Sequence, residues 1–194
     1  MIVRPASTTA LAKAVVKGLS QKGPYKGKLQ TGYFDTIAKI PTTSIVSYGL
    51  KPLVKLDGND SLYSTWARKD ELRNRDGSVN MALIDEYVAY CVETINEFLL
   101  QAMQACGTEG WSLTSPNRSP LLSLTPVNGL ISCLRKVISA GHVLSPELHK
   151  EAMARLKLVA IGEYKSSHWQ KLGLEIFSVC YGPIPVQAAE RAAE

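Results

Sequence analysis

The feature that most constrains this fold is a stretch of about 28 residues, 78–106, that contains neither glycine nor proline. Its apolar residues recur at steps of three and four, the spacing of one face of an α-helix. They are Met81, Ile84, Val88, Cys91, Val92, Ile95, Phe98, Leu99, Ala102, Met103 and Cys106. We expect Ser78 to cap this helix and Gly107 to end it. At 1.5 Å per residue it would be roughly 40 Å long, which is typical of the spine of a helical bundle.

Other stretches predict shorter helices around this spine. The first, 10–19, follows a possible cap at Ser7 or Thr8 and meets a stop signal at Lys17-Gly18. Further helices are predicted over 45–54, where Pro52 kinks the helix or begins a new turn, over 121–138, from Pro146 to Val159, and from a cap at Ser166 or Ser167 to a stop at Gly182-Pro183. Only residues 32–34 and 159–161 hint at strands. In the 121–138 helix, Gly129 costs stability, and a close helix contact is the expected compensation.

The predicted fold is therefore mostly α: a helical bundle around one long helix, with a basic N-terminal helix and loop arm. We expect three parts. Residues 1–40 form the basic helix and loop, residues 41–185 form the helical core domain, and residues 186–194 form a C-terminal tail.

Charge is distributed unevenly along the chain. The total is 22 Lys and Arg against 17 Asp and Glu, a net +5. Residues 1–55 hold nine basic residues and one acid, a net +8, whereas the rest of the chain has a net charge of −3. A basic segment of this kind indicates an anionic partner, such as the phosphates of a nucleic acid. The alternatives are a solvated arm or the inner face of an assembly.

The candidate phosphate contacts are basic residues of this segment, joined by one arginine that precedes a predicted helix, where an anion is favoured. They are Arg4, Lys13, Lys17, Lys22, Lys26, Lys28, Lys39 and Arg118. Tyr25, Tyr33 and Phe34 lie among the lysines of the loop. They could stack on bases or pin the loop to the core. The basic cluster at 68–75 is interrupted by acids, which favours a self-neutralised surface.

No catalytic or metal motif stands out. None of the four cysteines forms a Cys-x-x-Cys pair, and none of the three histidines forms a His-x-x-x-His pair, so zinc is not expected. We expect Cys91, Cys106 and Cys133 to be buried, reduced thiols; a catalytic pair of Cys133 with His142 is left open by spacing alone. Glu93 and Glu97 lack the Glu-x-x-His partners of di-iron bundles. The sequence therefore predicts a protein that is not an enzyme and has no cofactor.

The expected location is the cytoplasm, with no membrane contact. The longest apolar runs are far shorter than the ~20 residues that span a bilayer. Lys13 and Lys17 interrupt the first apolar segment, unlike a secretory signal.

Four stretches, in this order, resemble the C-terminal helical part of DGQHR-domain proteins, a group that includes regulators of DNA phosphorothioate modification. They are Thr42-Thr43-Ser44-Ile45-Val46-Ser47 with Leu50-Lys51-Pro52-Leu53, the long helix ending near Trp111, Ser119-Pro120-Leu121-Leu122-Ser123-Leu124-Thr125 before Asn128-Gly129-Leu130, and Ser167-His168-Trp169-Gln170-Lys171-Leu172-Gly173. The resemblance covers most of residues 40–180. The family's Asp-Gly-Gln-His-Arg motif is absent, so no functional residue is carried over.

This resemblance implies a DNA-linked setting, such as the control of DNA modification or defence. Together with the charge, it predicts a non-catalytic nucleic-acid-binding protein, with DNA favoured over RNA. The alternative is a helical scaffold or interaction subunit, as a homo-oligomer or in a larger complex, with the helices 78–106 and 121–138 offering the partner surface.

Overall fold

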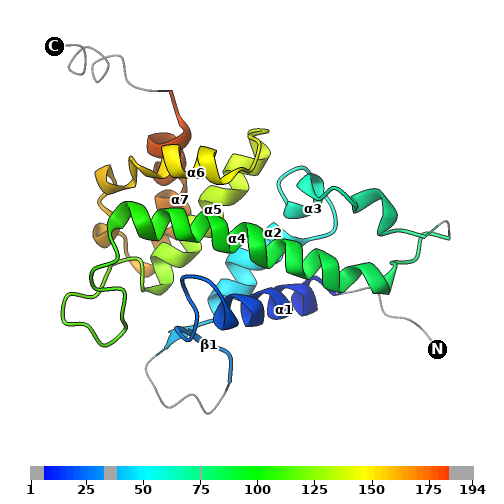
Figure 1. The fold of residues 1–194 in the computed structure, drawn as a ribbon, viewed down its shortest axis with the longest axis horizontal. Coiled ribbons are helices and arrows are strands. Elements are labelled where there is room, and N and C mark those ends of the chain that lie inside the picture. The colour runs from blue at the N-terminus through cyan, green and yellow to red at the C-terminus, as the bar shows by residue number, and fades with distance from the viewer. Residues whose placement is uncertain (1–6, 33–38, 75, 184–194) are drawn as a thin grey trace.

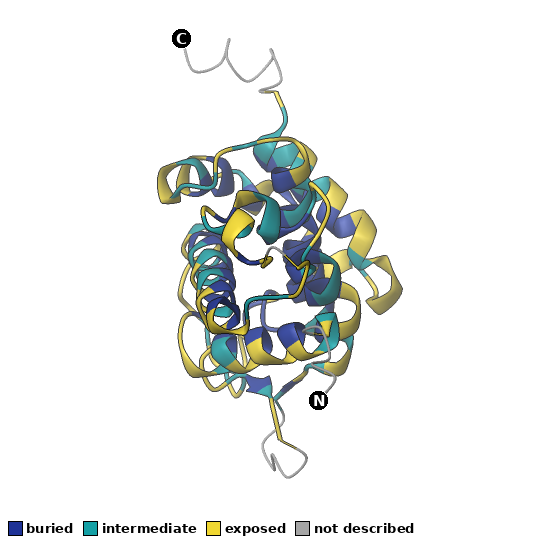
Figure 2. Ribbon diagram, turned by 90° about the vertical axis from the view of Figure 1, so that its right-hand side faces the viewer, coloured by how far each residue is buried: buried dark blue, intermediate teal, exposed yellow. Residues whose placement is uncertain are grey.

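A computed structural model describes residues 7–32, 39–74 and 76–183. The chain is mostly α-helical, as predicted. The long helix α4 (Ile84–Cys106) crosses the molecule. Helix α1 (Thr8–Gln21) lies along one side of it, and α5 (Leu124–Ser139), α6 (Pro146–Met153) and α7 (Trp169–Tyr181) gather toward its C-terminal end (Figure 1). Buried residues of these helices face a shared interior (Figure 2).

The spine begins later than the sequence indicated. Ser78 is not its cap: it lies in a turn in which its backbone N–H and its hydroxyl both donate to Asp76. A 3₁₀ turn, Met81–Leu83, precedes α4, and the Asn80 side chain accepts a hydrogen bond from Ala82 N at 3.2 Å. The helix has 23 residues, about 35 Å, and ends before Gly107, whose φ is +86°. The predicted end is confirmed.

Helices α5 and α7 pack closely against each other through glycine. A β-carbon on Gly129 would lie 2.8 Å from Leu172, and one on Gly173 would lie 2.8 Å from the Gly129 carbonyl oxygen. Neither position has room for a side chain. The close helix contact expected at Gly129 is confirmed, and its partner is α7.

Helix α1 is part of the bundle and does not project as an arm. Its buried face, Leu11, Ala12, Val15, Val16 and Leu19, joins the same hydrophobic core as α4 and α5. Gly18 does not end the helix as expected. It lies inside α1, where a β-carbon would approach Val92 of α4 to 2.5 Å.

Between α1 and α4 the chain forms short elements. Strands β1 (Leu29–Gln30) and β2 (Ile40–Pro41) pair in parallel, with Leu29 opposite Ile40. A π-helix, Ile45–Leu50, runs into α2 (Lys51–Val54), and Pro52 lies in the first turn of α2. The helix predicted over 45–54 is therefore confirmed, with a new turn at the proline. Helix α3 (Leu62–Thr65) and a 3₁₀ turn (Lys69–Glu71) follow.

In the C-terminal third, the helix that begins at Pro146 is shorter than the sequence indicated, whereas the last helix ends at the predicted stop. Ser145 caps α6 by accepting from Leu148 N at 3.1 Å, as predicted, but α6 ends at Met153. Three 3₁₀ turns, Leu156–Leu158, Ile161–Glu163 and Ser166–His168, then lead to α7, which ends before Gly182. Residues 159–161 form no strand. The predicted tail, 186–194, lies outside the described residues.

Candidate nucleic-acid interface

A basic recess lies between α1 and the segment that carries the π-helix, and we name it the lysine pocket. Its volume is about 640 Å³. Its lining residues are Thr9, Lys13, Val16, Lys17, Thr31, Thr42, Thr43, Val46, Ser47 and Lys51. Three lysines and five hydroxyl-bearing residues thus line one cavity, and none of the described residues that line it is acidic.

Helical spacing places the basic wall on α1. Thr9, Lys13 and Lys17 follow one another at intervals of four, so they share a face of the helix. The core-facing positions of α1 are apolar, which leaves both lysines exposed. Val16 lies at the boundary of the two faces, 5% exposed, and contributes apolar surface to the pocket.

The opposite wall is held by contacts to distant parts of the chain. Thr42 donates its hydroxyl hydrogen to the Gln30 carbonyl at 2.6 Å, beside the β1–β2 pair. Asn128 of α5 donates to the hydroxyl of Ser44 at 3.0 Å, just before the π-helix. Lys51 N bonds to the Val46 carbonyl in the wide π turn. These bonds fix the backbone that presents Ser47 and Lys51.

Among the described residues, the three lysines of the pocket have no acidic partner. Within residues 7–32, 39–74 and 76–183, no carboxylate forms an ion pair with Lys13, Lys17 or Lys51. In a concave site, such charges raise the local concentration of anions. The lining of the lysine pocket therefore favours anions over cations.

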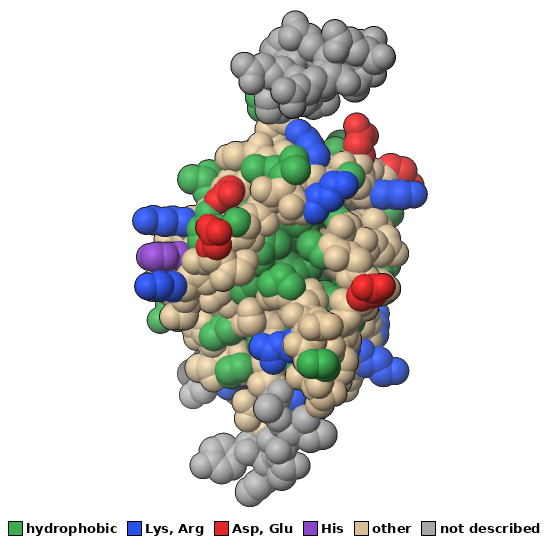
Figure 3. All heavy atoms as spheres, turned by 90° about the vertical axis from the view of Figure 1, so that its left-hand side faces the viewer, with side chains coloured by type: hydrophobic (Ala, Val, Ile, Leu, Met, Phe, Trp, Pro, Cys, Tyr) green, Lys and Arg blue, Asp and Glu red, His purple; other side chains and the backbone are tan. Residues whose placement is uncertain are grey.

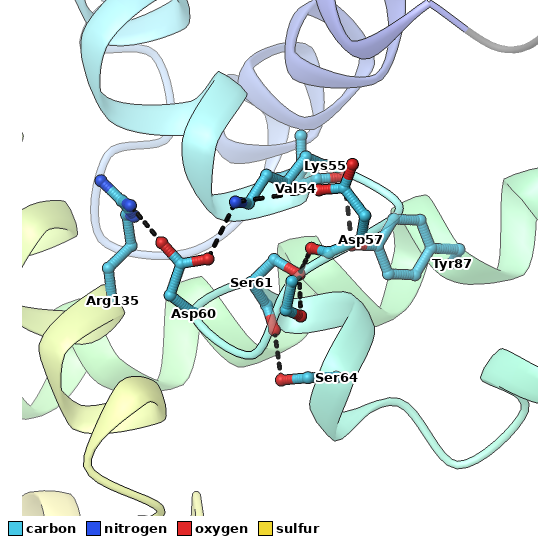
Figure 4. Close-up of polar contacts among 9 residues, drawn as sticks. Val54, Lys55, Asp57, Asp60, Ser61, Ser64, Tyr87 and Arg135 are labelled. Carbon is cyan, nitrogen blue, oxygen red and sulfur yellow. Dashed lines mark hydrogen bonds and ion pairs between the residues drawn. The ribbon is translucent and has the colours of Figure 1, made fainter.

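Lys55, the last basic residue of the N-terminal quarter, is neutralised inside the fold. Its ammonium group lies 2.9 Å from Asp60, which also pairs with Arg135 of α5 (Figure 4). Burial opposes ionisation of Asp60, but the hydrogen bonds from Lys55 and Arg135 outweigh it and lower the pKa of the carboxyl group. The Asp57–Asp60 turn thus supplies a counter-ion to two cations.

Two other predicted contacts, Lys39 and Arg118, line a second cavity at the start of α5. Together with Ser123 and Leu124, they line a cavity of about 220 Å³. The same cavity is lined by Ile40 and Pro41 of β2. Since Thr42 and Thr43 line the lysine pocket, the short segment 39–43 runs from one basic cavity to the other.

The remaining predicted contacts lie apart from these cavities. Lys22 and Lys28 line an apolar cavity of about 660 Å³ that also holds Glu93 and Glu97, and Lys22 lies 3.5 Å from Glu93. Lys26 is exposed on the loop. Arg4 lies outside the described residues. The structure therefore divides the predicted contacts among separate places instead of aligning them all in one stripe.

Of the three aromatic residues among the loop lysines, Tyr25 lies in the described part of the chain, and it anchors the loop to the core. Tyr25 is 1% exposed, and its hydroxyl donates to the Leu121 carbonyl at 2.8 Å. Trp111 packs edge-on against it and donates to the Pro24 carbonyl at 2.8 Å. Tyr25 is thus not available to stack on bases. Tyr33 and Phe34 lie outside the described residues.

Charge elsewhere is mixed. Arg68 pairs with Glu71 at 2.7 Å and with Glu86, which confirms that the basic cluster at 68–75 is neutralised at this residue. On the face shown in Figure 3, acidic and basic side chains both surround an apolar hollow. That face carries no continuous basic stripe among the residues described.

The two residues considered for a catalytic pair, Cys133 and His142, have different surroundings. Cys133 is fully buried, and burial raises the pKa of its thiol well above the ordinary value, so the nucleophilic thiolate is disfavoured. His142 packs its ring against Phe177 and Tyr181. Among the described residues, no cluster of His, Cys, Asp and Glu could hold a metal ion. Cys91 is buried as expected, whereas Cys106 is exposed at the end of α4.

The apolar helix expected to offer a partner surface is not available for that role. The hydrophobic residues of α5 from Val127 to Ile138 are at most 4% exposed, because they pack within this chain. No helix in the described part of the chain has the length and apolar character needed to cross a bilayer.

Sequence reasoning missed part of the pocket. Lys51 lies in the basic segment but is not among the predicted contacts, and neither are the hydroxyl residues. A signal existed: Ser47 and Lys51 are four apart, as Thr9, Lys13 and Lys17 are. That these two segments line the same cavity, however, depends on the tertiary structure.

Comparisons with protein-family models, with curated proteins and with solved structures find no match to this chain.

Proposed function

We propose that this protein binds nucleic acid without catalysis, and that the lysine pocket is its principal phosphate contact. The observation that carries the proposal is that Lys13, Lys17 and Lys51 line one recess together with five hydroxyl-bearing residues, and that no acidic residue of the described part of the chain lines it. Lysine ammonium groups are usual donors to phosphate oxygens, and hydroxyls can add to them; the Thr42 hydroxyl hydrogen is already donated to the Gln30 carbonyl.

The arrangement of the two basic cavities supports a polyanion over a single small ion. Segment 39–43 connects the lysine pocket with the cavity of Lys39 and Arg118. A strand with repeated phosphates could contact both cavities at once, so that the binding free energies of the two contacts add. Lys22, Lys26, Lys28 and Arg4 are proposed as secondary contacts, with Lys22 weakened by Glu93.

The resemblance to the helical part of DGQHR-domain proteins favours DNA, in the control of DNA modification or defence. All four cysteines are free thiols, which supports a reducing compartment such as the cytoplasm. The DNA preference is tested directly by comparing DNA with RNA of the same sequence.

The experiment is fluorescence anisotropy with labelled single-stranded DNA, duplex DNA and RNA from 50 to 300 mM salt. Binding should weaken steeply with salt, with a slope in log K of about −0.9 per phosphate on duplex DNA and about −0.7 on single strands. Changing Lys13, Lys17 and Lys51 together to Ala should weaken binding by at least tenfold and flatten the slope, by roughly one unit for each phosphate that is no longer neutralised.

The matched control changes Lys150, Lys157 and Lys165 to Ala. These three lysines are exposed and line none of the cavities described above, so the net charge changes equally while the pocket is kept. Equal losses of affinity in both triple variants would mean that only overall charge matters. No binding at low salt would reject the proposal, and a homo-oligomer in light scattering would then favour the interaction-subunit alternative.

A further inference from the structure

The lysine pocket is a recess, and its shape limits what can enter it. A volume of about 640 Å³ lies within the range of sites that enclose small ligands. Proteins that read duplex DNA project a helix or strand into a groove about 12 Å wide. Here the basic side chains surround a hollow, so the group that they bind must protrude into the protein.

The three lysines of the pocket carry more positive charge than one internal phosphate can neutralise. An internal phosphodiester carries a single negative charge, whereas a phosphomonoester carries about −1.5 to −2 at neutral pH and has three acceptor oxygens. Lys13 and Lys17 come from α1, and Lys51 comes from the opposite wall. Three cations on two walls match a group with the higher charge.

The pocket also offers apolar surface beside its charge. Val16 and Val46, 5% and 8% exposed, line it together with the lysines. The sugar or base attached to a phosphate could lie against these side chains while the phosphate meets the ammonium groups. A free inorganic anion would make no use of that surface.

The wall that carries Lys51 has an unusual backbone. Ile45–Leu50 is a π-helix, and π-helical turns occur frequently at functional sites. Its wide turn lies directly at the pocket, since Val46, Ser47 and Lys51 all line it. This observation is independent of the charge of the lysines.

We propose that the lysine pocket binds the terminal phosphomonoester of a nucleic-acid strand, with Lys13, Lys17 and Lys51 surrounding the phosphate. This inference rests on the proposed function and narrows it from a strand to the end of a strand. The rest of the strand then passes along segment 39–43 toward Lys39 and Arg118.

The test compares single-stranded oligonucleotides of one sequence with a 5′-phosphate, a 3′-phosphate or hydroxyls at both ends, each carrying its fluorophore at an internal base. We expect one phosphorylated end to bind about tenfold or more tightly than the unphosphorylated strand. The 5′ and 3′ arms identify which end enters. The matching nucleoside monophosphate should compete, and the nucleoside should not.

The variant that isolates the pocket is Lys51→Gln, with Lys150→Gln as its matched control. Lys51→Gln should remove most of the preference for the phosphorylated end, while the control keeps it; circular dichroism checks that both variants are folded. Equal affinity for all three oligonucleotides, in a chain that still binds them, would overturn the inference and leave the proposed function intact. No binding of any oligonucleotide would overturn both.

Discussion

At the residue scale, Asp60 determines which basic side chains are paired within the fold. It pairs with Lys55, five residues earlier, and with Arg135, 75 residues later. The Asp60 side chain is 24% exposed, so these pairs are partly shielded from water and are stronger than ordinary surface pairs. Lys55 thus serves the fold, whereas Lys51, four residues earlier, lines the lysine pocket.

Changing Asp60 to Asn should lower the free energy of unfolding by about 1–2 kcal/mol at pH 7, because both cations lose their counter-ion. The Asp60 pKa is lowered in the fold, so its stabilisation is present above the unfolded pKa near 3.9 and disappears as pH falls through the folded value. Urea unfolding at pH 7 and at pH 3 measures both effects.

The control is Asp57→Asn, since Asp57 is 77% exposed and lies 3.7 Å from Lys55. It should change stability at pH 7 by less than about 0.5 kcal/mol. Equal effects of the two substitutions would show that Asp60 has no special role in the network.

At the element scale, the α5–α7 contact depends on the absence of side chains. Gly129 and Gly173 let the two helices approach until the Leu172 side chain and a backbone carbonyl occupy the space of a β-carbon. Since α5 also anchors the pocket wall through Asn128 and Ser44, its placement affects the candidate site. The cost of a glycine within a helix is offset here by packing.

Gly129→Ala should lower the free energy of unfolding by about 1–3 kcal/mol despite the higher helix propensity of alanine, because the new methyl group meets Leu172. Gly162→Ala is the comparison, since its β-carbon would have nothing within 4 Å. Thermal and urea unfolding measure both. A stabilised Gly129→Ala variant would mean that α5 and α7 are not in close contact.

At the scale of the whole molecule, α1 links the basic segment to the core. Its exposed face presents Thr9, Lys13 and Lys17, and its buried face packs on α4. The proposed binding surface and part of the core therefore belong to one helix, whereas the N-terminal arm that the sequence suggested would have separated them.

A chain that begins at residue 22 should lose cooperative unfolding, because the apolar surface that α1 covers on α4 would be open to water. The double variant Lys13→Ala, Lys17→Ala keeps the buried face and should unfold like the parent chain. Circular dichroism during urea unfolding distinguishes them. Full helicity and an unchanged midpoint in the shortened chain would show that α1 is an independent arm after all.

The local pattern of residues was enough to predict most helices, because helical periodicity and capping act over a few neighbours. It placed the spine, the end at Gly107 and the Ser145 cap, and it located the basic charge in residues 1–55. It could not place the start of α4, because Asn80 begins a 3₁₀ turn that competes with Ser78 as a cap. The sequence pattern also predicted a helix end at Gly18. The reason for a glycine at this position is its packing on Val92, which only the tertiary structure shows.

Tertiary structure alone decided which basic residues line the same cavity. Lys13 and Lys51 are 38 positions apart in the sequence, yet they line one pocket, while Lys55 and Lys22 have acidic neighbours. The sequence by itself determined how much positive charge the first quarter of the chain carries. Whether that charge is paired or free depends on contacts between distant segments, and these are set by how the helices bury their apolar faces.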